Sequence, residues 1–337
     1  MGITGVEVAT FIYAYVLPCQ VLIGCCGNIM NLIVLLDRQM RKARTHLLFA
    51  AMALSDLAFL ISSLGTWLMI QRFFPPSQPM MDFLKNHRHY PNGLCNWFSA
   101  MSIYFMIYAT AERVSVIKSP FRASKEPVTA RFAASLLLIS VVSLAICGIH
   151  FMSHQQRKLW PDLQRSWIMA QMLLVVVVPF VLTTFMNAML IVELKKNRCQ
   201  MHALSDNYSE KQILQDNKRS RDERKITIMV VVISTSFIVC NAPGAVIYTL
   251  KVFELTKLTG GFTHLIETIS NCLAVTGKVL NFFLFCSSSQ RFRKLLRIRL
   301  ENWRYCRSSK YARRSSSKLN HSHSQANRTL SMPMTEL

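Results

Sequence analysis

Seven long apolar runs constrain the fold of this chain more than any other feature of its sequence. They cover residues 11–36, 46–70, 94–117, 131–152, 167–192, 226–250 and 262–286. A helix needs about 20 mainly apolar residues to cross a bilayer, and within hydrocarbon each backbone polar group must find its partner inside the protein. We therefore predict an all-α membrane protein, built as a bundle of seven transmembrane helices.

The distribution of basic residues predicts the orientation of this bundle. A net charge of +22 would suggest a nucleic-acid binder if it formed a patch on a soluble domain. Here 30 of the 39 Lys and Arg residues fall on one side, in segments 37–45, 112–131, 193–225 and 290–337, whereas the opposite loops hold 8. The positive-inside rule then places the N-terminus outside and the C-terminus in the cytosol. We expect the basic side to face membrane lipid and cytosolic partners, with no nucleic-acid partner.

Two ionisable residues stand within the apolar runs, where a charge needs a partner or a function. Asp56 and Lys278 lie at similar depths, roughly 15 and 12 Å from the cytoplasmic ends of their helices at about 1.5 Å per residue. Asn281 shares a helix face with Lys278, and Ser102 lies at about the depth of Asp56. We predict that Asp56 and Lys278 pair; the alternative is that Lys278 snorkels toward an interface.

A second charged group lies at the cytoplasmic side. Glu112 and Arg113 end the third run, and Glu223 stands just before the sixth. We expect Arg113 to pair with Glu112 and Glu223 and so to hold the third and sixth helices together. The alternative is a solvated cluster whose acids favour a helix N-terminus.

Several motifs together resemble those of the rhodopsin-like (class A) G-protein-coupled receptors, over residues 17–299. The matching segments are Gly27-Asn28, Leu54-Ser55-Asp56-Leu57, Glu112-Arg113-Val114, Phe237 with Cys240 and Pro243, and Asn281 to Phe285. Within that family the chain looks most similar to invertebrate FMRFamide/myosuppressin-type peptide receptors and nematode serpentine class-w chemoreceptors. The resemblance implies a plasma-membrane receptor, without enzymatic activity, cofactor or metal, that transmits binding of an extracellular peptide or small molecule to a heterotrimeric G-protein.

The resemblance also implies roles for individual residues. Activation and G-protein coupling are expected of Glu112, Arg113, Glu223, Asn281 and Phe285. In relatives the acid and serine matching Asp56 and Ser102 help to hold a sodium ion. We interpret the equivalent buried polar core here, with the Lys278 ammonium in place of the ion, as Asn28, Asp56, Ser102, Lys278 and Asn281. Ligand binding is expected of Asn96, Ser99, Gln171, Asn241, Tyr248, Glu267 and Asn271. Glu254 and Glu267 would suit a cationic ligand.

The chain departs from the family pattern at several positions. Asn241 replaces the usual sixth-helix tryptophan, and Phe282 and Phe285 replace the proline and tyrosine of the seventh helix. The family usually has a disulfide bridge between the outer end of the third helix and the second extracellular loop. Cys95 lies too few residues before Arg113 to match the usual position of the first cysteine, and residues 153–166 contain no cysteine that could be the second. Either the chain is a divergent receptor, or its sequence lacks segments near 72–96 and 153–166. The functional alternatives are an ion- or proton-coupled transporter and a non-signalling receptor homologue.

The remaining predictions concern the ends of the chain. Residues 1–10 are expected to form a short extracellular N-terminus, 11–289 the transmembrane domain, 290–305 an amphipathic juxtamembrane helix and 306–337 a disordered cytoplasmic tail. Cys286 and Cys306 are palmitoylation candidates beside the inner membrane surface. Tail serines and the C-terminal Thr335-Glu336-Leu337 suggest arrestin-like and PDZ partners.

Overall fold

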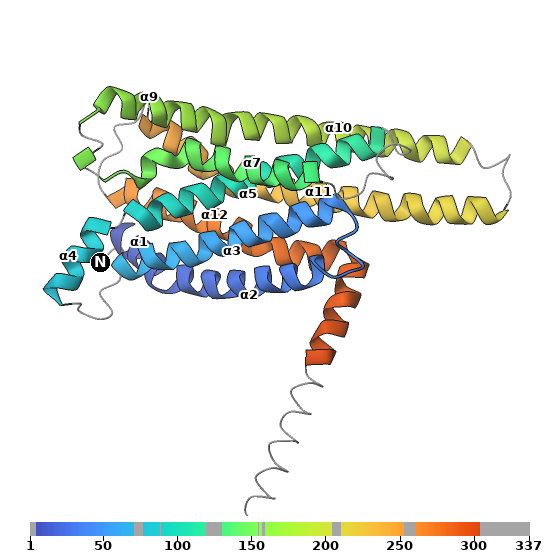
Figure 1. The fold of residues 1–337 in the computed structure, drawn as a ribbon, viewed down its shortest axis with the longest axis horizontal. Helices are drawn as coiled ribbons and strands as arrows, with labels where there is room; N and C mark the ends of the chain where they lie inside the picture. The colour runs from blue at the N-terminus through green and yellow to red at the C-terminus, as the bar shows by residue number, and fades with distance from the viewer. Residues whose placement is uncertain are drawn as a thin grey trace, which may run out of the picture. The chain divides into compact units, whose positions relative to one another are not determined.

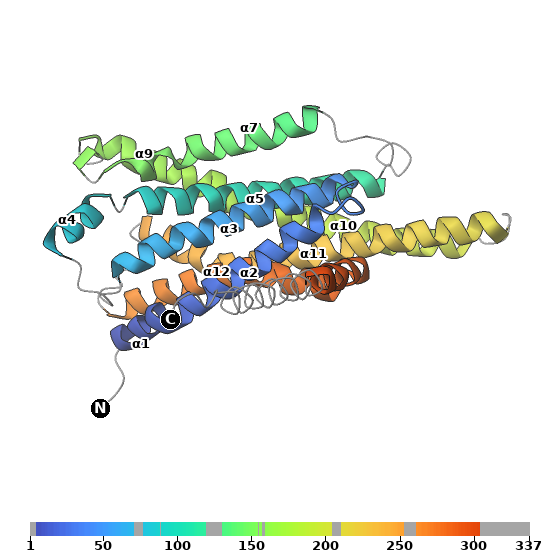
Figure 2. The ribbon, with the colours of Figure 1, turned by 60° about the horizontal axis from the view of Figure 1, so that its bottom comes forward.

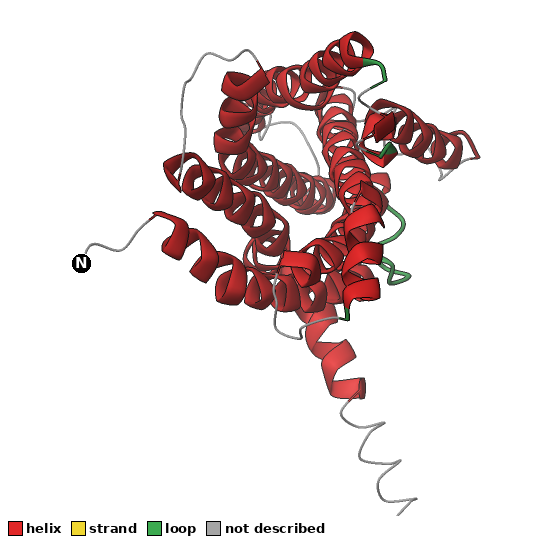
Figure 3. Ribbon diagram, turned by 90° about the vertical axis from the view of Figure 1, so that its left-hand side faces the viewer, coloured by secondary structure: helices red, strands yellow, loops and turns green. Residues whose placement is uncertain are grey.

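The computed structural model describes residues 5–70, 77–87, 89–118, 130–153, 155–156, 159–203, 210–252 and 261–303. Within these ranges the chain is helical almost throughout and contains no strand, in agreement with the predicted all-α class (Figure 3). The chain divides into two compact units, Met1–Ser289 and Gln290–Leu337.

The first unit is a bundle of long helices (Figure 1). Its N-terminal part comprises α1 (Gly5–Phe11), the π-helical η1 (Ile12–Val16), α2 (Leu17–Leu35), α3 (Arg44–Ile70), α4 (Gln78–His87) and α5 (His89–Lys118). The next elements are α7 (Ala130–Cys147), the 3-10 helix η2 (Gly148–Phe151), α9 (Pro161–Met172), the π-helical η3 (Leu173–Val177) and α10 (Val178–Ala203). The unit ends with α11 (Glu210–Val252) and α12 (Gly261–Ser288).

Six of the described helical segments are long and apolar enough to cross a membrane. They are Gly5–Leu35, Arg44–Leu64, Ala130–Phe151, Pro161–Lys196, Arg224–Gly244 and Thr263–Ser288. The remaining predicted span, residues 94–117, lies within α5, which is long enough to cross but less apolar. Because α5 packs against α3, α7, α10 and α11, much of its surface meets other helices instead of lipid and can carry polar side chains.

Apolar side chains cover the outer faces of the bundle. Leu137 and Leu138 of α7 are 66% and 63% exposed, and Phe185 of α10 is 62% exposed. A soluble protein rarely leaves such large side chains exposed in continuous helix faces. In a bilayer these faces contact lipid tails, so their exposure is the expected state of a membrane-spanning bundle.

Several helices are longer than the apolar runs that predicted them. The first begins at Gly5 instead of residue 11. α10 continues to Ala203 and α11 begins at Glu210, and both project beyond the other helices at one end of the bundle (Figure 1 and Figure 2). Hydrophobicity marks only the part of a helix that lies in hydrocarbon, whereas the hydrogen-bonded backbone continues wherever the polar sequence permits it.

Glycines allow α12 to lie close to two neighbouring helices. A Cβ atom on Gly27 of α2 would lie 2.9 Å from Cβ of Phe282, and one on Gly277 of α12 would lie 2.9 Å from Cβ of Cys240. Both distances are too short for carbon atoms in van der Waals contact. These close approaches fix α12 against α2 and α11 on either side of Lys278.

The second unit begins with a helix over residues 290–303. The amphipathic juxtamembrane helix was expected over residues 290–305, so the helical residues fall within it. The tail predicted to be disordered, 306–337, lies outside the described residues.

Candidate functional site

A buried carboxylate joins three helices in the middle of the bundle. Asp56 of α3 is 0% exposed. Its Oδ1 accepts hydrogen bonds from Lys278 Nζ at 2.9 Å and from Ser102 Oγ at 2.7 Å. Its Oδ2 accepts a hydrogen bond from Asn281 Nδ2 at 2.8 Å. The ion pair predicted between Asp56 and Lys278 is therefore present and connects α3 to α12, and the hydrogen bond from Ser102 adds α5.

Lys278 does not snorkel to a surface. The residue is 4% exposed, and its Nζ lies 4.5 Å from the ring centroid of Phe59, a cation–π distance. Asn28 of α2 donates from Nδ2 to the carbonyl oxygen of Gly24 at 2.9 Å and to that of Lys278 at 3.4 Å. The five residues predicted as a buried polar core thus lie together.

The charges in this core neutralise each other. Removing a carboxylate and an ammonium from water is costly, and the cost is offset only when the two groups pair closely and their remaining hydrogen-bonding positions are filled. Asp56 meets this condition, because each of its oxygens accepts at least one hydrogen bond. A variant that removes either charge leaves the other buried without its countercharge.

Arg113 lies near the C-terminal end of α5 and is 4% exposed. Its Nε donates a hydrogen bond to Thr45 Oγ1 of α3 at 2.6 Å. The side chain of Glu223 lies outside the described residues. The pairing of Arg113 with Glu112 and Glu223 therefore stays a prediction, and the described contact joins α5 to α3.

Phe285 lies one turn after Asn281 on α12 and is fully buried. Its ring meets that of Phe49 on α3 edge to face, with centroids 5.1 Å apart. Asn281 and Phe285 therefore bind α12 to α3, the first through the Asp56 carboxylate and the second through aromatic packing.

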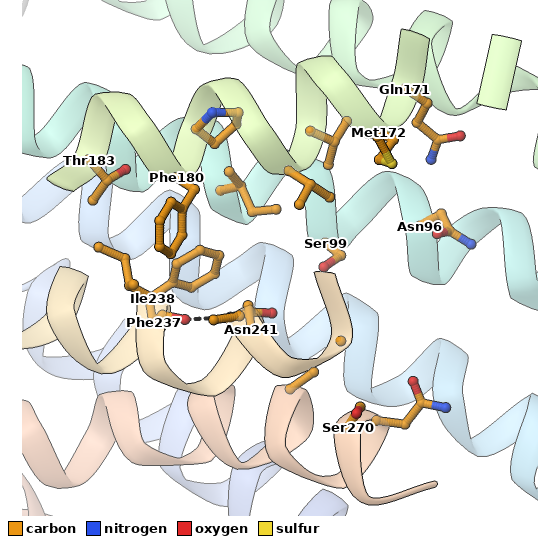
Figure 4. A pocket seen from close by; sticks show the side chains of 18 of the residues that line it. Asn96, Ser99, Gln171, Met172, Phe180, Thr183, Phe237, Ile238, Asn241 and Ser270 are labelled. Atoms are coloured by element: carbon orange, nitrogen blue, oxygen red, sulfur yellow. Dashed lines mark hydrogen bonds between the residues drawn. The ribbon is translucent and has the colours of Figure 1, made fainter. Parts of the chain in front are cut away.

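A cavity of about 260 Å³ lies among α5, η2, the α9–η3–α10 helix, α11 and α12. Five of the seven residues expected to bind a ligand line it, namely Asn96, Ser99, Gln171, Asn241 and Asn271. Figure 4 shows Ser99 reaching from α5 toward α11, where Asn241 lies. Glu267 is not among the lining residues, and the side chain of Tyr248 lies outside the described residues.

The cavity is also lined by residues that were not among the expected ligand-binding residues. His150 of η2 lies with Nε2 2.8 Å from Gln171 Oε1. Phe180 and Phe237 form part of an apolar wall beside the amides (Figure 4). No motif marked His150 or Phe180, and Phe237 was marked only as part of the sixth-helix motif, because a place in the cavity wall depends on how the helices pack and not on a pattern along the chain.

Comparison with known proteins places this arrangement in a family. Residues 27–285, more than half of the chain, match the profile of the family described as 7 transmembrane receptor (rhodopsin family). The chain belongs to this family. It is a multi-pass membrane protein and a divergent class A G-protein-coupled receptor.

Individual proteins to which this chain is similar are also named as receptors. A Caenorhabditis elegans protein named as a G-protein coupled receptor is 25% identical over 312 residues, which cover 83% of this chain and 71% of the relative. A second such C. elegans protein is 23% identical over 312 residues, covering 85% and 68%. The rat somatostatin receptor type 4 is 22% identical over 329 residues, covering 88% and 75%. These similarities favour a receptor over a transporter.

A further hydrogen bond in the receptor joins α10 to α11. Ser234 is fully buried, and its Oγ donates to Asn187 Oδ1 at 2.7 Å. Asn187 lies eight residues after Pro179 on α10. The structure shows that the asparagine makes an interhelical contact there.

The cysteines of the receptor form no extracellular bridge within the described residues. Cys95 and Cys147 are both free, and the Cys95 thiol lies 3.9 Å from the carbonyl oxygen of Phe59. Of the two palmitoylation candidates, Cys286 is half-buried at the end of α12 and Cys306 lies outside the described residues. No described group of three or more His, Cys, Asp or Glu side chains could hold a metal ion.

Proposed function

We propose that the cavity binds an extracellular ligand, either a neuropeptide or a chemosensory small molecule, and that binding changes the affinity of the opposite end of the bundle for a heterotrimeric G-protein. The observation that supports this proposal is the composition of the cavity wall. It includes α5 and α11, the helices that also carry Arg113 and Glu223. A ligand that binds two arrangements of these helices differently shifts the equilibrium between them.

The proposal requires that the cavity and Arg113 face opposite sides of the plasma membrane. Asn96 and Arg113 are about 25 Å apart along α5 at 1.5 Å per residue, close to the thickness of the hydrocarbon. We place the cavity toward the outside with the N-terminus, and Arg113 toward the cytosol with the C-terminus. The excess of Lys and Arg on the Arg113 side supports this orientation.

The coupling residues act at the cytoplasmic side of this arrangement. In the resting state Arg113 is held within the bundle, where its Nε donates to Thr45. Movement of α11 away from α5 releases Arg113 from Glu223 and opens a site for the G-protein. Glu112 tunes the charge beside Arg113, while Asn281 and Phe285 keep α12 in register with α3.

The polar core sets the balance between the two arrangements. The Lys278 ammonium takes the position at Asp56 that a diffusible cation would otherwise occupy. Support comes from the 2.9 Å ion pair and from the Ser102 hydroxyl and Asn281 amide that also contact the carboxylate. This receptor therefore carries its own cation on α12.

The tail adds contacts outside the bundle. The helix over residues 290–303 lies on anionic lipid through its Arg and Lys side chains, and palmitoylation of Cys286 and Cys306 strengthens this attachment. Phosphorylated tail serines recruit an arrestin-like protein, and the C-terminal carboxylate of Leu337 binds a PDZ domain.

Receptor function is tested by G-protein activation in transfected cells exposed to a panel of synthetic neuropeptides and small odorant molecules. We expect at least one agonist, whose response disappears in Arg113→Ala although the variant reaches the cell surface. Lipid-facing Thr184→Val is the control and should respond as the wild type does. A surface-expressed receptor that answers no member of the panel would favour a non-signalling homologue.

A further inference from the structure

We infer that the chemical group accommodated by the cavity is an uncharged donor of N–H hydrogen bonds, of the carboxamide class, attached to an apolar body. This inference rests on the proposed ligand-binding function and narrows its ligand class. It differs from the cationic ligand that Glu254 and Glu267 suggested in the sequence; Glu254 lies outside the described residues, and Glu267 does not line the cavity.

The described wall of the cavity has almost no ionisable side chains. None of the described lining residues is an Asp, Glu, Lys or Arg, and His150 is the ionisable side chain among them. The Asp56 carboxylate lies outside this lining and is already neutralised by Lys278. A ligand ammonium or guanidinium would therefore leave water without meeting a countercharge in the described lining, which disfavours it. A carboxylate would meet there only the His150 imidazole, whose Nε2 already lies 2.8 Å from Gln171 Oε1.

Hydrogen bonds to other parts of the protein fix the orientation of the asparagine side chains in the cavity wall. Three lining asparagines donate from Nδ2 to other parts of the protein: Asn96 to the Asn92 carbonyl at 2.9 Å, Asn241 to the Phe237 carbonyl at 2.8 Å and Asn271 to the Tyr13 hydroxyl at 3.2 Å. Within the described residues no hydrogen bond reaches their Oδ1 atoms. These donations orient the amides and leave each oxygen, with the second N–H of Asn241 and of Asn271, to bind a ligand.

The remaining lining hydroxyls fit the same ligand class. Ser270 Oγ donates to the Ile266 carbonyl at 2.8 Å and so retains its acceptor capacity. Ser99 makes no described hydrogen bond, and its hydroxyl can donate. The cavity thus offers uncharged acceptors together with uncharged donors. A carboxamide complements this set with two N–H donors and one carbonyl acceptor.

The shape and the apolar wall define the rest of the ligand. Met172, Val175, Phe180 and Phe237 line the cavity beside the polar groups. The volume of about 260 Å³ is slightly below the range of about 300–1,000 Å³ typical of sites for drug-sized molecules. It suits a small aromatic or aliphatic amide, or the end of a longer ligand.

Three isosteric probes test this inference directly: neutral benzamide, cationic benzamidine and anionic benzoate. Their binding to the purified full-length receptor in nanodiscs is measured by ligand-observed NMR titration at pH 7.4. We expect benzamide to bind at least tenfold more tightly than either charged probe. Asn241→Leu should weaken benzamide binding about tenfold or more, whereas Thr184→Val should leave it unchanged.

Loss of benzamide binding in Asn241→Leu could also result from misfolding, so a second variant is chosen that should gain binding of a different probe. Asn241→Asp places a carboxylate in the cavity wall, and we expect it to reverse the preference toward benzamidine. Stronger binding of benzamidine or benzoate than of benzamide to the wild type, or no saturable binding of any probe, overturns the inference. A receptor that prefers benzamide but has no agonist in the cell assay refutes the proposed signalling function and leaves this inference standing.

Discussion

The lysine at position 278 places an ion pair with Asp56 in the interior of this receptor, where relatives hold a sodium ion. A buried ion pair gives little net stability, because desolvation of both groups offsets their attraction. Its importance lies in what happens when one member is lost. With Asp56 0% and Lys278 4% exposed, neither group can reach bulk water to recover its hydration.

At this residue scale, Asp56→Asn should destabilise the receptor by about 3–5 kcal/mol, because the Lys278 ammonium is left buried without its countercharge. The double variant Asp56→Asn with Lys278→Ser removes both charges and should recover part of this loss. Surface expression and thermal unfolding in detergent measure the effect. Ser62→Ala on the same helix is the control, because its hydroxyl contacts only its own helix in the described structure. Equal damage in the single and double variants contradicts the pairing.

Sodium provides a second test at the residue scale. In Lys278→Ser the Asp56 carboxylate and Ser102 hydroxyl would offer oxygen ligands to a hard cation. With a dissociation constant near 10 mM, 150 mM sodium would stabilise this variant by about 1–2 kcal/mol. The wild type should unfold at the same temperature when choline chloride replaces sodium chloride at equal ionic strength. Equal dependence on sodium in both proteins would show that Lys278 does not occupy a cation's position.

At the scale of helices, apolar runs were sufficient to predict the fold class but not the helix ends. The span in α5 was predicted from its apolar run, although polar residues such as Ser102 and Arg113 make this helix less apolar than the other spans. The ends of α10 and α11 were missed because helical hydrogen bonding extends beyond the apolar segment. Distances along helices placed five of the predicted ligand residues at one cavity. His150 was missed because its contact with Gln171 depends on tertiary packing.

The close approach of α2 and α12 makes a prediction at this scale. Gly27→Val would force a side chain into Phe282, whose Cβ lies 2.9 Å from the position of a Cβ on residue 27. The expected cost is about 1–3 kcal/mol, the usual range for an overpacked core. Gly148→Val is a suitable comparison, because a Cβ at Gly148 meets no atom within 4 Å. If thermal unfolding shows equal losses for both variants, the effect lies in helix propensity and not in the contact between helices.

At the scale of the whole bundle, α5 links the features on which function depends. It contributes Asn96 and Ser99 to the cavity, Ser102 to the polar core and Arg113 to the far end. The helix also packs against α3, α7, α10 and α11. A ligand that changes the packing around α5 at the cavity can therefore affect the surroundings of Arg113 without a separate relay.

The orientation of the receptor in the plasma membrane is the most direct test of this account. Epitope tags at the two termini of the full-length receptor are stained with antibodies before and after permeabilisation of the cells. We predict that the N-terminal tag is accessible on intact cells and the C-terminal tag only after permeabilisation. Staining of the C-terminal tag on intact cells would place Arg113 outside and contradict the proposed coupling to a cytosolic G-protein.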